Sequence, residues 1–198
     1  SCYVALEALL SAAPGALPLP NHTAVIALFD HEECGSGSER GAESVLLSQL
    51  LGRLVDHHPE RSIGGLPRAL ARSFFVSSDM AHGVHPNYAD KHEPNHKPML
   101  GGGPVIKTNV NMSYATDAET AARFRAACQD EQVAWQEFVV RTDIACGSTI
   151  GAIAAAGLAV RTVDVGCAML SMHSIREQAG ASDVGAMTRV LRRILVEG

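Results

Sequence analysis

The stretch TAVIALFDHEECGSGSERG, residues 23–41, decides the fold. Residues 23–29 form a largely apolar run that predicts a buried strand. Acidic residues and a histidine follow the run, and a glycine-rich turn comes next. Helical periodicity then extends from Ser38 to about Asp56. A strand, a turn and a helix in this order are typical of a layered α/β fold.

The rest of the chain repeats this alternation. We predict further strands at residues 73–78, 104–110, 137–141 and 160–165, and helices at residues 1–12, 66–72, 117–130, 149–156 and 183–196. Loops are expected at residues 14–21 and 57–67. Residues 79–103 form a long irregular segment of the kind that usually carries function. The expected fold is an α/β/α sandwich with a mixed, largely parallel sheet.

Composition predicts one globular domain and argues against several classes of protein. The chain has 198 residues, 46% of them hydrophobic, and a net charge of −5. The acidic balance argues against nucleic-acid binding, and no apolar run approaches the ~20 residues of a membrane span. Its five cysteines lack C-x-x-C spacing, so we expect a reducing compartment, the cytoplasm. Because the chain begins without Met inside a helical pattern, we expect a fragment.

Carboxylates and imidazoles gather where the predicted strands end, which is where ligands bind in open α/β sheets. The residues at these ends are Asp30, His31, Glu32, Glu33, Asp79, His82, His85, Asp143, Asp164 and His173. One Glu, one Asp and one His form a set suited to zinc or a similar divalent ion, and a second Glu could take a proton from bound water. Taken singly, such residues are more often a solvated loop, a helix cap or a structural histidine.

Three further features leave alternatives open. The turn GSGSERG could bind a dinucleotide, but its spacing is one residue too long and Glu32 and Glu33 would repel a pyrophosphate. Lys107, in an otherwise uncharged strand, could pair with a buried or substrate carboxylate, or could lie in solvent at a sheet edge. His92 and His96 have helical i, i+4 spacing, but Pro94 between them favours a structural loop.

Several motifs together closely resemble the aspartyl aminopeptidase family of zinc metallopeptidases. They are DHEECGS, SSDMAHGVHPNYADKHEPNHKPMLGGGPVIK, CGSTIG and MHSIRE, in this order. The similarity extends over essentially the whole chain. It implies an enzyme that removes N-terminal Asp or Glu from peptides, uses a metal-bound hydroxide as nucleophile, holds two zinc ions per complete site and forms homo-oligomers.

The resemblance also implies roles for individual residues. Glu32 matches the general base. Zinc ligands are matched by Glu33 and His173, which would share one ion, and by Asp79 on the other. Substrate-contacting positions are matched by His82, Lys107 and Tyr114. Cys34 stands where the family usually has valine.

The same resemblance implies that residues 1–198 are the C-terminal part of the catalytic domain. A bridging aspartate, a further histidine, the N-terminal catalytic segment and the inserted dimerisation domain of the family fall outside this chain. Neither zinc site is complete without them, because a zinc site usually needs three protein ligands or more. An inactive or non-catalytic fragment is therefore the main alternative to an active enzyme.

Overall fold

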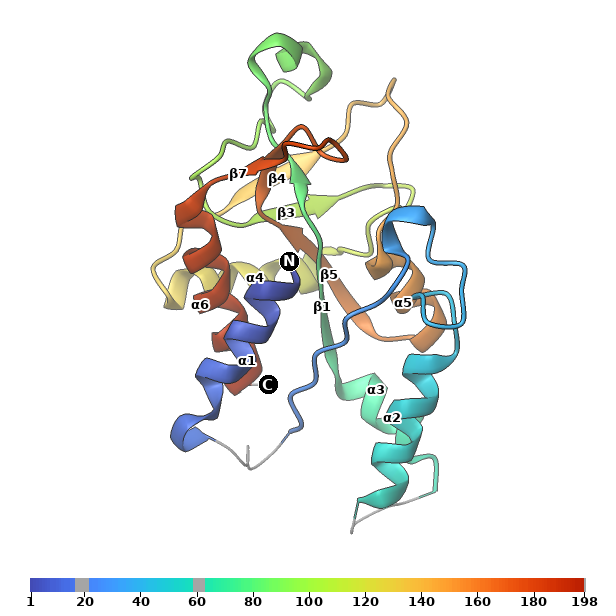
Figure 1. Ribbon diagram of the computed structural model, residues 1–198. Helices are drawn as coiled ribbons and strands as arrows, with labels where there is room; N and C mark the ends of the chain where they lie inside the picture. The colour runs from blue at the N-terminus through green and yellow to red at the C-terminus, as the bar shows by residue number, and fades with distance from the viewer. Residues whose placement is uncertain (17–21, 59–62, 198) are drawn as a thin grey trace.

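The computed structural model describes residues 1–16, 22–58 and 63–197 (Figure 1). Its helices are α1 (Cys2–Ala16), α2 (Leu46–His57), α3 (Gly65–Arg72), α4 (Ala118–Asp130), α5 (Ile150–Leu158) and α6 (Ala181–Glu197). Its strands are β1 (Phe74–Ser78), β2 (Ala81–His82), β3 (Val105–Thr108), β4 (Gln136–Val139), β5 (Arg161–Gly166), β6 (Ala168–Leu170) and β7 (Gln178–Ala179). No helix in these ranges is long and apolar enough to cross a membrane.

The main sheet has four strands in the order β1-β5-β3-β4. β1 is parallel to β5 and β3 is parallel to β4, whereas β3 and β5 are antiparallel. A small sheet, β2-β6-β7, continues from the ends of β1 and β5 and pairs β2 with β6 in parallel. The expected mixed, largely parallel sheet is confirmed.

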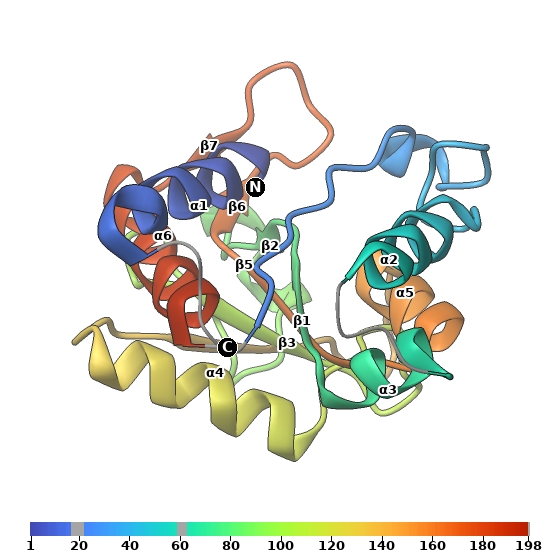
Figure 2. The ribbon, with the colours of Figure 1, turned by 90° about the horizontal axis from the view of Figure 1, so that it is seen from below.

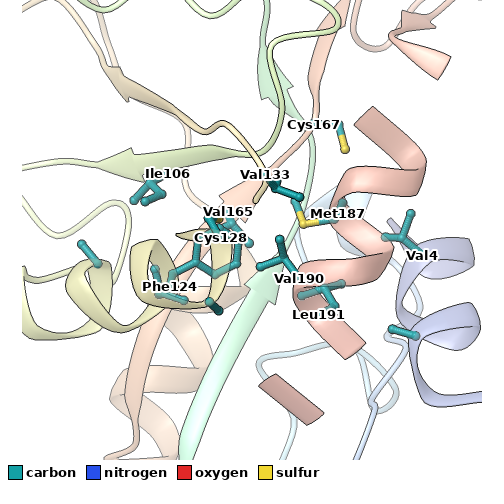
Figure 3. Packing of buried hydrophobic residues seen from close by; sticks show 14 residues of the cluster. Val4, Ile106, Phe124, Cys128, Val133, Val165, Cys167, Met187, Val190 and Leu191 are labelled. Carbon is teal, nitrogen blue, oxygen red and sulfur yellow. The ribbon is translucent and has the colours of Figure 1, made fainter. Parts of the chain in front are cut away.

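Helices cover both faces of the main sheet. Figure 2 shows α1, α4 and α6 on one side and α2, α3 and α5 on the other. On the first side, Val165 of β5 packs in one apolar cluster with Phe124 of α4 and with Met187 and Val190 of α6 (Figure 3). Val163 belongs to the same cluster. Burying a side chain of the size of Phe124 contributes about 1.5–3 kcal/mol. This apolar layer fixes β5 and therefore the polar residues on its opposite face.

The expected start of α4 is confirmed. Asp117 is the N-cap, and its Oδ1 accepts a hydrogen bond of 2.8 Å from the Thr120 N–H. The Thr120 hydroxyl in turn accepts one of 3.0 Å from the Asp117 N–H, which completes a capping box. Four apolar side chains of this helix, Ala121, Phe124, Ala127 and Cys128, are buried.

Two predictions for residues 23–56 are wrong. Residues 23–29 are extended but pair with no strand among the described residues, and Val25 and Leu28 are 44% and 55% exposed. A strand needs a hydrogen-bonded neighbour, and the run has none here. The helix expected from Ser38 begins at Leu46. Residues 38–45 are turns because the chain folds back on Ser36, whose carbonyl oxygen accepts from Glu43.

The loop predictions are tested in part. α1 continues to Ala16, so residues 14–16 are helical rather than loop. The remainder of the first predicted loop, residues 17–21, and residues 59–62 of the second lie outside the described residues. The short helix predicted at residues 66–72 is confirmed as α3.

Candidate active site

A cleft extends along β1 and past its carboxyl end. All of the site residues expected from the sequence line it, although they come from distant parts of the chain. These residues are Glu32, Glu33, Asp79, His82, Lys107, Tyr114 and His173. The fold therefore brings together all seven residues to which the family resemblance gives a role.

The paired glutamates lie in a short 3-10 turn, Glu32–Cys34, rather than at the end of a strand. His31 before the turn and Gly35 after it have φ of 64° and 104°, in the left-handed region that favours glycine. The His31 carbonyl oxygen accepts from the N–H of Ser36 at 2.8 Å, which closes the bend. The glycine-rich segment is thus a sharp turn that presents two carboxylates to the cleft.

The turn does not have the features of a dinucleotide site. A dinucleotide-binding glycine turn opens directly into a helix, whose N-terminus receives the pyrophosphate. Here α2 begins only at Leu46, after a series of turns. The two carboxylates remain beside the turn, where they would repel an anion.

Glu32 lies in an environment that favours its protonated form. Partial burial raises the pKa of its carboxyl group above the ordinary value, and the charges of Asp79 and Glu33 raise it further. Lys107 and His173 oppose this rise. A raised pKa suits a carboxyl group that accepts a proton and later returns it.

Asp79 is held by the end of the β1–β5 ladder. Its N–H donates to the Val165 carbonyl oxygen at 3.0 Å. Its own carbonyl oxygen lies so close to Gly166 that a Cβ there would be 1.7 Å away. Gly166 is therefore required for this approach, and the carboxylate of Asp79 reaches the cleft because of it.

Lys107 places a buried cation at the base of the cleft. Its side chain is 2% exposed, and Nζ lies 3.4 Å from Asp79 Oδ2. The ammonium also donates to the carbonyl oxygens of Asp79 and Met80 at 3.4 and 3.3 Å, and it lies 5.2 Å from the ring centroid of Tyr114. The interpretation of Lys107 as a solvated edge lysine is wrong, because β3 has neighbours on both sides.

Aromatic rings form the wall next to this cation. The His82 and Tyr114 rings lie 6.2 and 6.3 Å from that of Phe138, between centroids. Burial lowers the pKa of His82 and raises the pKa of Tyr114, so both groups are neutral near pH 7. The wall can exchange hydrogen bonds with a ligand while Lys107 supplies the charge.

Glu33 and His173 meet across the mouth of the cleft. Glu33 Oε2 and His173 Nε2 are 2.8 Å apart, and both side chains are well exposed. His173 has a φ of 66°, and its N–H donates to Glu177 Oε1 at 2.7 Å. A non-glycine residue held in this strained region is common at functional sites. The contact brings a carboxylate and an imidazole together from opposite ends of the chain.

Comparison with known proteins assigns the family. Residues 1–194 match the family described as aminopeptidase I zinc metalloprotease (M18). The chain belongs to this family. The "Probable M18 family aminopeptidase 2" of Pseudomonas aeruginosa (strain UCBPP-PA14) is 51% identical over 96% of the chain. The match covers 42% of that relative, so the chain spans less than half the length of the curated relatives it matches.

Solved M18 structures have the same fold. A chain in the cryo-EM structure of the Ape4 and Nbr1 complex superposes with a TM-score of 0.91 at 38% identity, covering 98% of this chain and 37% of that one. The S. cerevisiae mApe1 dodecamer gives a TM-score of 0.82 at 27% identity, with coverage of 98% and 44%. The resemblance to zinc aminopeptidases that the sequence motifs indicated is therefore confirmed.

The donor chemistry of this M18 chain suits zinc, but the donor count is small. Carboxylate and imidazole groups are the ligands that zinc takes alongside thiolates. Glu33 and His173 provide one such pair, and Asp79 provides a separate carboxylate. Within residues 1–16, 22–58 and 63–197, no group of three or more His, Cys, Asp or Glu is arranged to hold a metal ion. The chain thus offers part of a zinc site.

Some residues of this M18 cleft gave no signal in the sequence. Phe138 lies inside a strand pattern, and nothing in that pattern indicates that its ring contacts both His82 and Tyr114. His92 also packs against Phe138, at 6.1 Å between centroids, whereas His96 pairs with Glu93. The expected structural role of the His92 and His96 pair agrees with these separate contacts.

Proposed function

We propose that the complete protein containing this chain is a zinc-dependent aminopeptidase that releases N-terminal Asp or Glu from peptides. The observation that carries the proposal is the convergence of Glu32, Glu33, Asp79 and His173 on one cleft, with the ammonium of Lys107 at its base. Membership of the M18 family supports the reaction class. The free ammonium group and the acidic side chain of the substrate would both find oppositely charged partners in this cleft.

Glu32 is the proposed general base. Its raised pKa suits a group that takes a proton from the attacking water and returns it to the leaving amine. The nearby charges of Lys107 and His173 favour the ionised form needed for the first transfer. Asp79 and Glu33 favour the protonated form needed for the second.

Glu33 and His173 would hold one zinc ion, and Asp79 would contribute to a second. When bound, zinc polarises the scissile carbonyl group and makes a water molecule more acidic. Ligands from the part of the protein beyond this chain would complete both sites. This division follows from the family resemblance and from the small number of donors that face one another here.

The proposed preference for acidic N-termini rests on Lys107. A carboxylate that reaches the base of the cleft would share the ammonium with Asp79 and gain a charge-assisted hydrogen bond. His82 and Tyr114 stand beside this position as neutral hydrogen-bonding groups. A neutral apolar side chain would leave the cation without a substrate partner.

The proposal also covers the oligomeric state of the complete protein and its location in the cell. The mApe1 neighbour is described as a dodecamer, and we infer that the complete protein is also a homo-oligomer. The cysteines of the described residues are free thiols, which suits a cytoplasmic protein.

Hydrolysis of matched peptides tests the proposed function. Peptides that differ only in their first residue, Asp, Asn, Glu, Gln or Leu, are incubated with the zinc-loaded complete protein. We expect Asp to be released about tenfold or more faster than isosteric Asn, because a charge-assisted hydrogen bond contributes about 1.5–3 kcal/mol. Chelation should stop the reaction and zinc should restore it. Equal rates for Asp and Leu would refute the acidic preference, and no release from any peptide would refute the aminopeptidase.

A second candidate is a fragment with no activity of its own, favoured by the incomplete donor set. Zinc content and Asp release of this chain alone distinguish the two. Stoichiometric zinc with peptide cleavage by residues 1–198 would exclude the inactive fragment.

A further inference from the structure

Asp164 is a buried carboxylate that the proposed reaction leaves without a role. It lies in β5 between Val163 and Val165 and is 0% exposed. Because successive strand side chains point to opposite faces, it faces α5 rather than the apolar layer. No ion pair involves Asp164 among the residues that the structure describes. A buried charge is costly unless hydrogen bonds compensate it.

Its hydrogen bonds all hold the wall of the cleft. Oδ2 accepts from the Ala115 N–H at 2.6 Å, and Oδ1 accepts from the Thr149 hydroxyl at 2.7 Å. The Asp164 N–H donates to the Thr116 hydroxyl oxygen at 2.8 Å. One residue therefore ties together the segment that follows Tyr114 and the N-cap of α5.

The two segments tied by Asp164 meet again in the cleft. Tyr114, Thr149 and Cys146 all line it. Cys146 also packs against the buried apolar cluster that contains Tyr114. Thr149 makes no capping bond to its own helix, because its hydroxyl is directed to Asp164. The Thr149 hydroxyl therefore bonds to a carboxylate on β5 instead of capping α5.

Gly151 supplies independent support. In the first turn of α5, a Cβ on Gly151 would lie 2.2 Å from Asp164 Oδ1. The helix therefore leaves a space that the carboxylate fills at the positive end of the helix dipole. Such a space is expected where the position of a buried carboxylate matters.

We propose that Asp164 is a positioning residue that fixes Tyr114 and the segment Cys146–Thr149 as one wall of the substrate cleft. The kinetic effect expected of this role rests on the proposed function. The structural effect, which is that residues 114–116 are held in one conformation, does not depend on the proposed function.

The kinetic test uses Asp164→Ala in the zinc-loaded complete protein, with an N-terminal Asp peptide. We expect KM to rise about tenfold or more with a smaller change in kcat, because substrate contacts are displaced and Glu32 is not. Asp164→Asn should recover to within about threefold of the wild type, since an amide can accept from Ala115 and donate to Thr149. In a Tyr114→Phe background the effect of Asp164→Ala should shrink, because the two residues act through one contact.

The control is Asp117→Ala. It removes a helix-capping carboxylate of α4, a helix that packs on the other face of the sheet. We expect it to lower stability without changing KM. An equal KM change in Asp164→Ala and Asp117→Ala, or full additivity with Tyr114→Phe, would overturn the proposal.

Hydrogen exchange of the Ala115 amide separates failure of this inference from failure of the proposed function. Asp164→Ala should speed exchange in residues 114–116 about tenfold or more, because the amide loses its acceptor, while α4 exchanges as before. Should Asp164→Ala fail to fold, Thr149→Val removes one contact and should show the same changes at smaller size. Unchanged exchange in a folded variant would overturn the inference whether or not peptides are cleaved.

Discussion

Replacing Gly166 by alanine should damage both the stability of the fold and the proposed zinc site. The new Cβ would lie 1.7 Å from the Asp79 carbonyl oxygen, whereas real Cβ atoms essentially never approach closer than 3.0 Å. Backbone atoms of Asp79 and Met80 must therefore move by more than about 1 Å, because no flexible side chain can yield instead. The 3.0 Å hydrogen bond from Asp79 to Val165 would break, and so would the contacts of Asp79 with Lys107.

The expected loss is about 2–4 kcal/mol, from about 1–3 kcal/mol for overpacking and about 1 kcal/mol for the hydrogen bond. Chemical unfolding of the complete protein measures this loss, and zinc content should fall because Asp79 is displaced. The matched control is Gly185→Ala in α6, where a Cβ meets nothing within 4 Å. This variant should gain about 0.4–1 kcal/mol. A Gly166→Ala protein as stable as the wild type, with full zinc content, would refute the reasoning.

Three further changes have defined outcomes. Lys107→Met should reduce the preference for an Asp peptide over a Leu peptide about 10- to 100-fold in kcat/KM, and an unchanged preference would remove Lys107 from substrate binding. Asp183→Ala leaves two turn amides, that of Gly103 buried and that of Gly101 partly buried, without the acceptor that lies 2.9 and 2.8 Å away, and should cost about 2–4 kcal/mol in chemical unfolding. Burial lowers the pKa of His82 and His92 below 6.5, so the unfolded chain binds more protons between the lowered values and pH 6.5, and the unfolding free energy rises with pH through this window. His92→Gln should make that rise less steep, and an identical pH dependence would contradict the assignment.

The fold was predictable where the pattern of one segment is sufficient. The apolar face of α4 and its cap at Asp117 follow from periodicity and from the preference of aspartate for N-caps. Residues 23–29 show where this approach fails. An apolar run reports a tendency to be buried, but a strand forms only beside a partner, and the described residues supply none.

The charged residues of the site could be predicted from the sequence, but the aromatic residues that line the cleft could not. Glu32, Asp79 and His173 stand out because several carboxylates and imidazoles together follow predicted strands, where ligands bind in open α/β sheets, although each taken singly is more often structural. Tyr114 was expected only from the family resemblance, because its place in the cleft depends on distant packing. Asp164 had a signal, an aspartate inside an apolar strand, yet it was expected at the strand end. β5 continues to Gly166 and buries it instead.

The rate of Asp release by the Glu32→Gln variant of the complete protein tests the central claim most directly. Glutamine keeps the size of the side chain but cannot take a proton, so kcat should fall about 100- to 10,000-fold. Zinc content and KM should stay close to those of the wild type, because Glu33, Asp79 and His173 are unchanged. A Glu32→Gln protein that binds zinc normally and keeps its rate within about threefold would contradict the assignment of Glu32 as the general base.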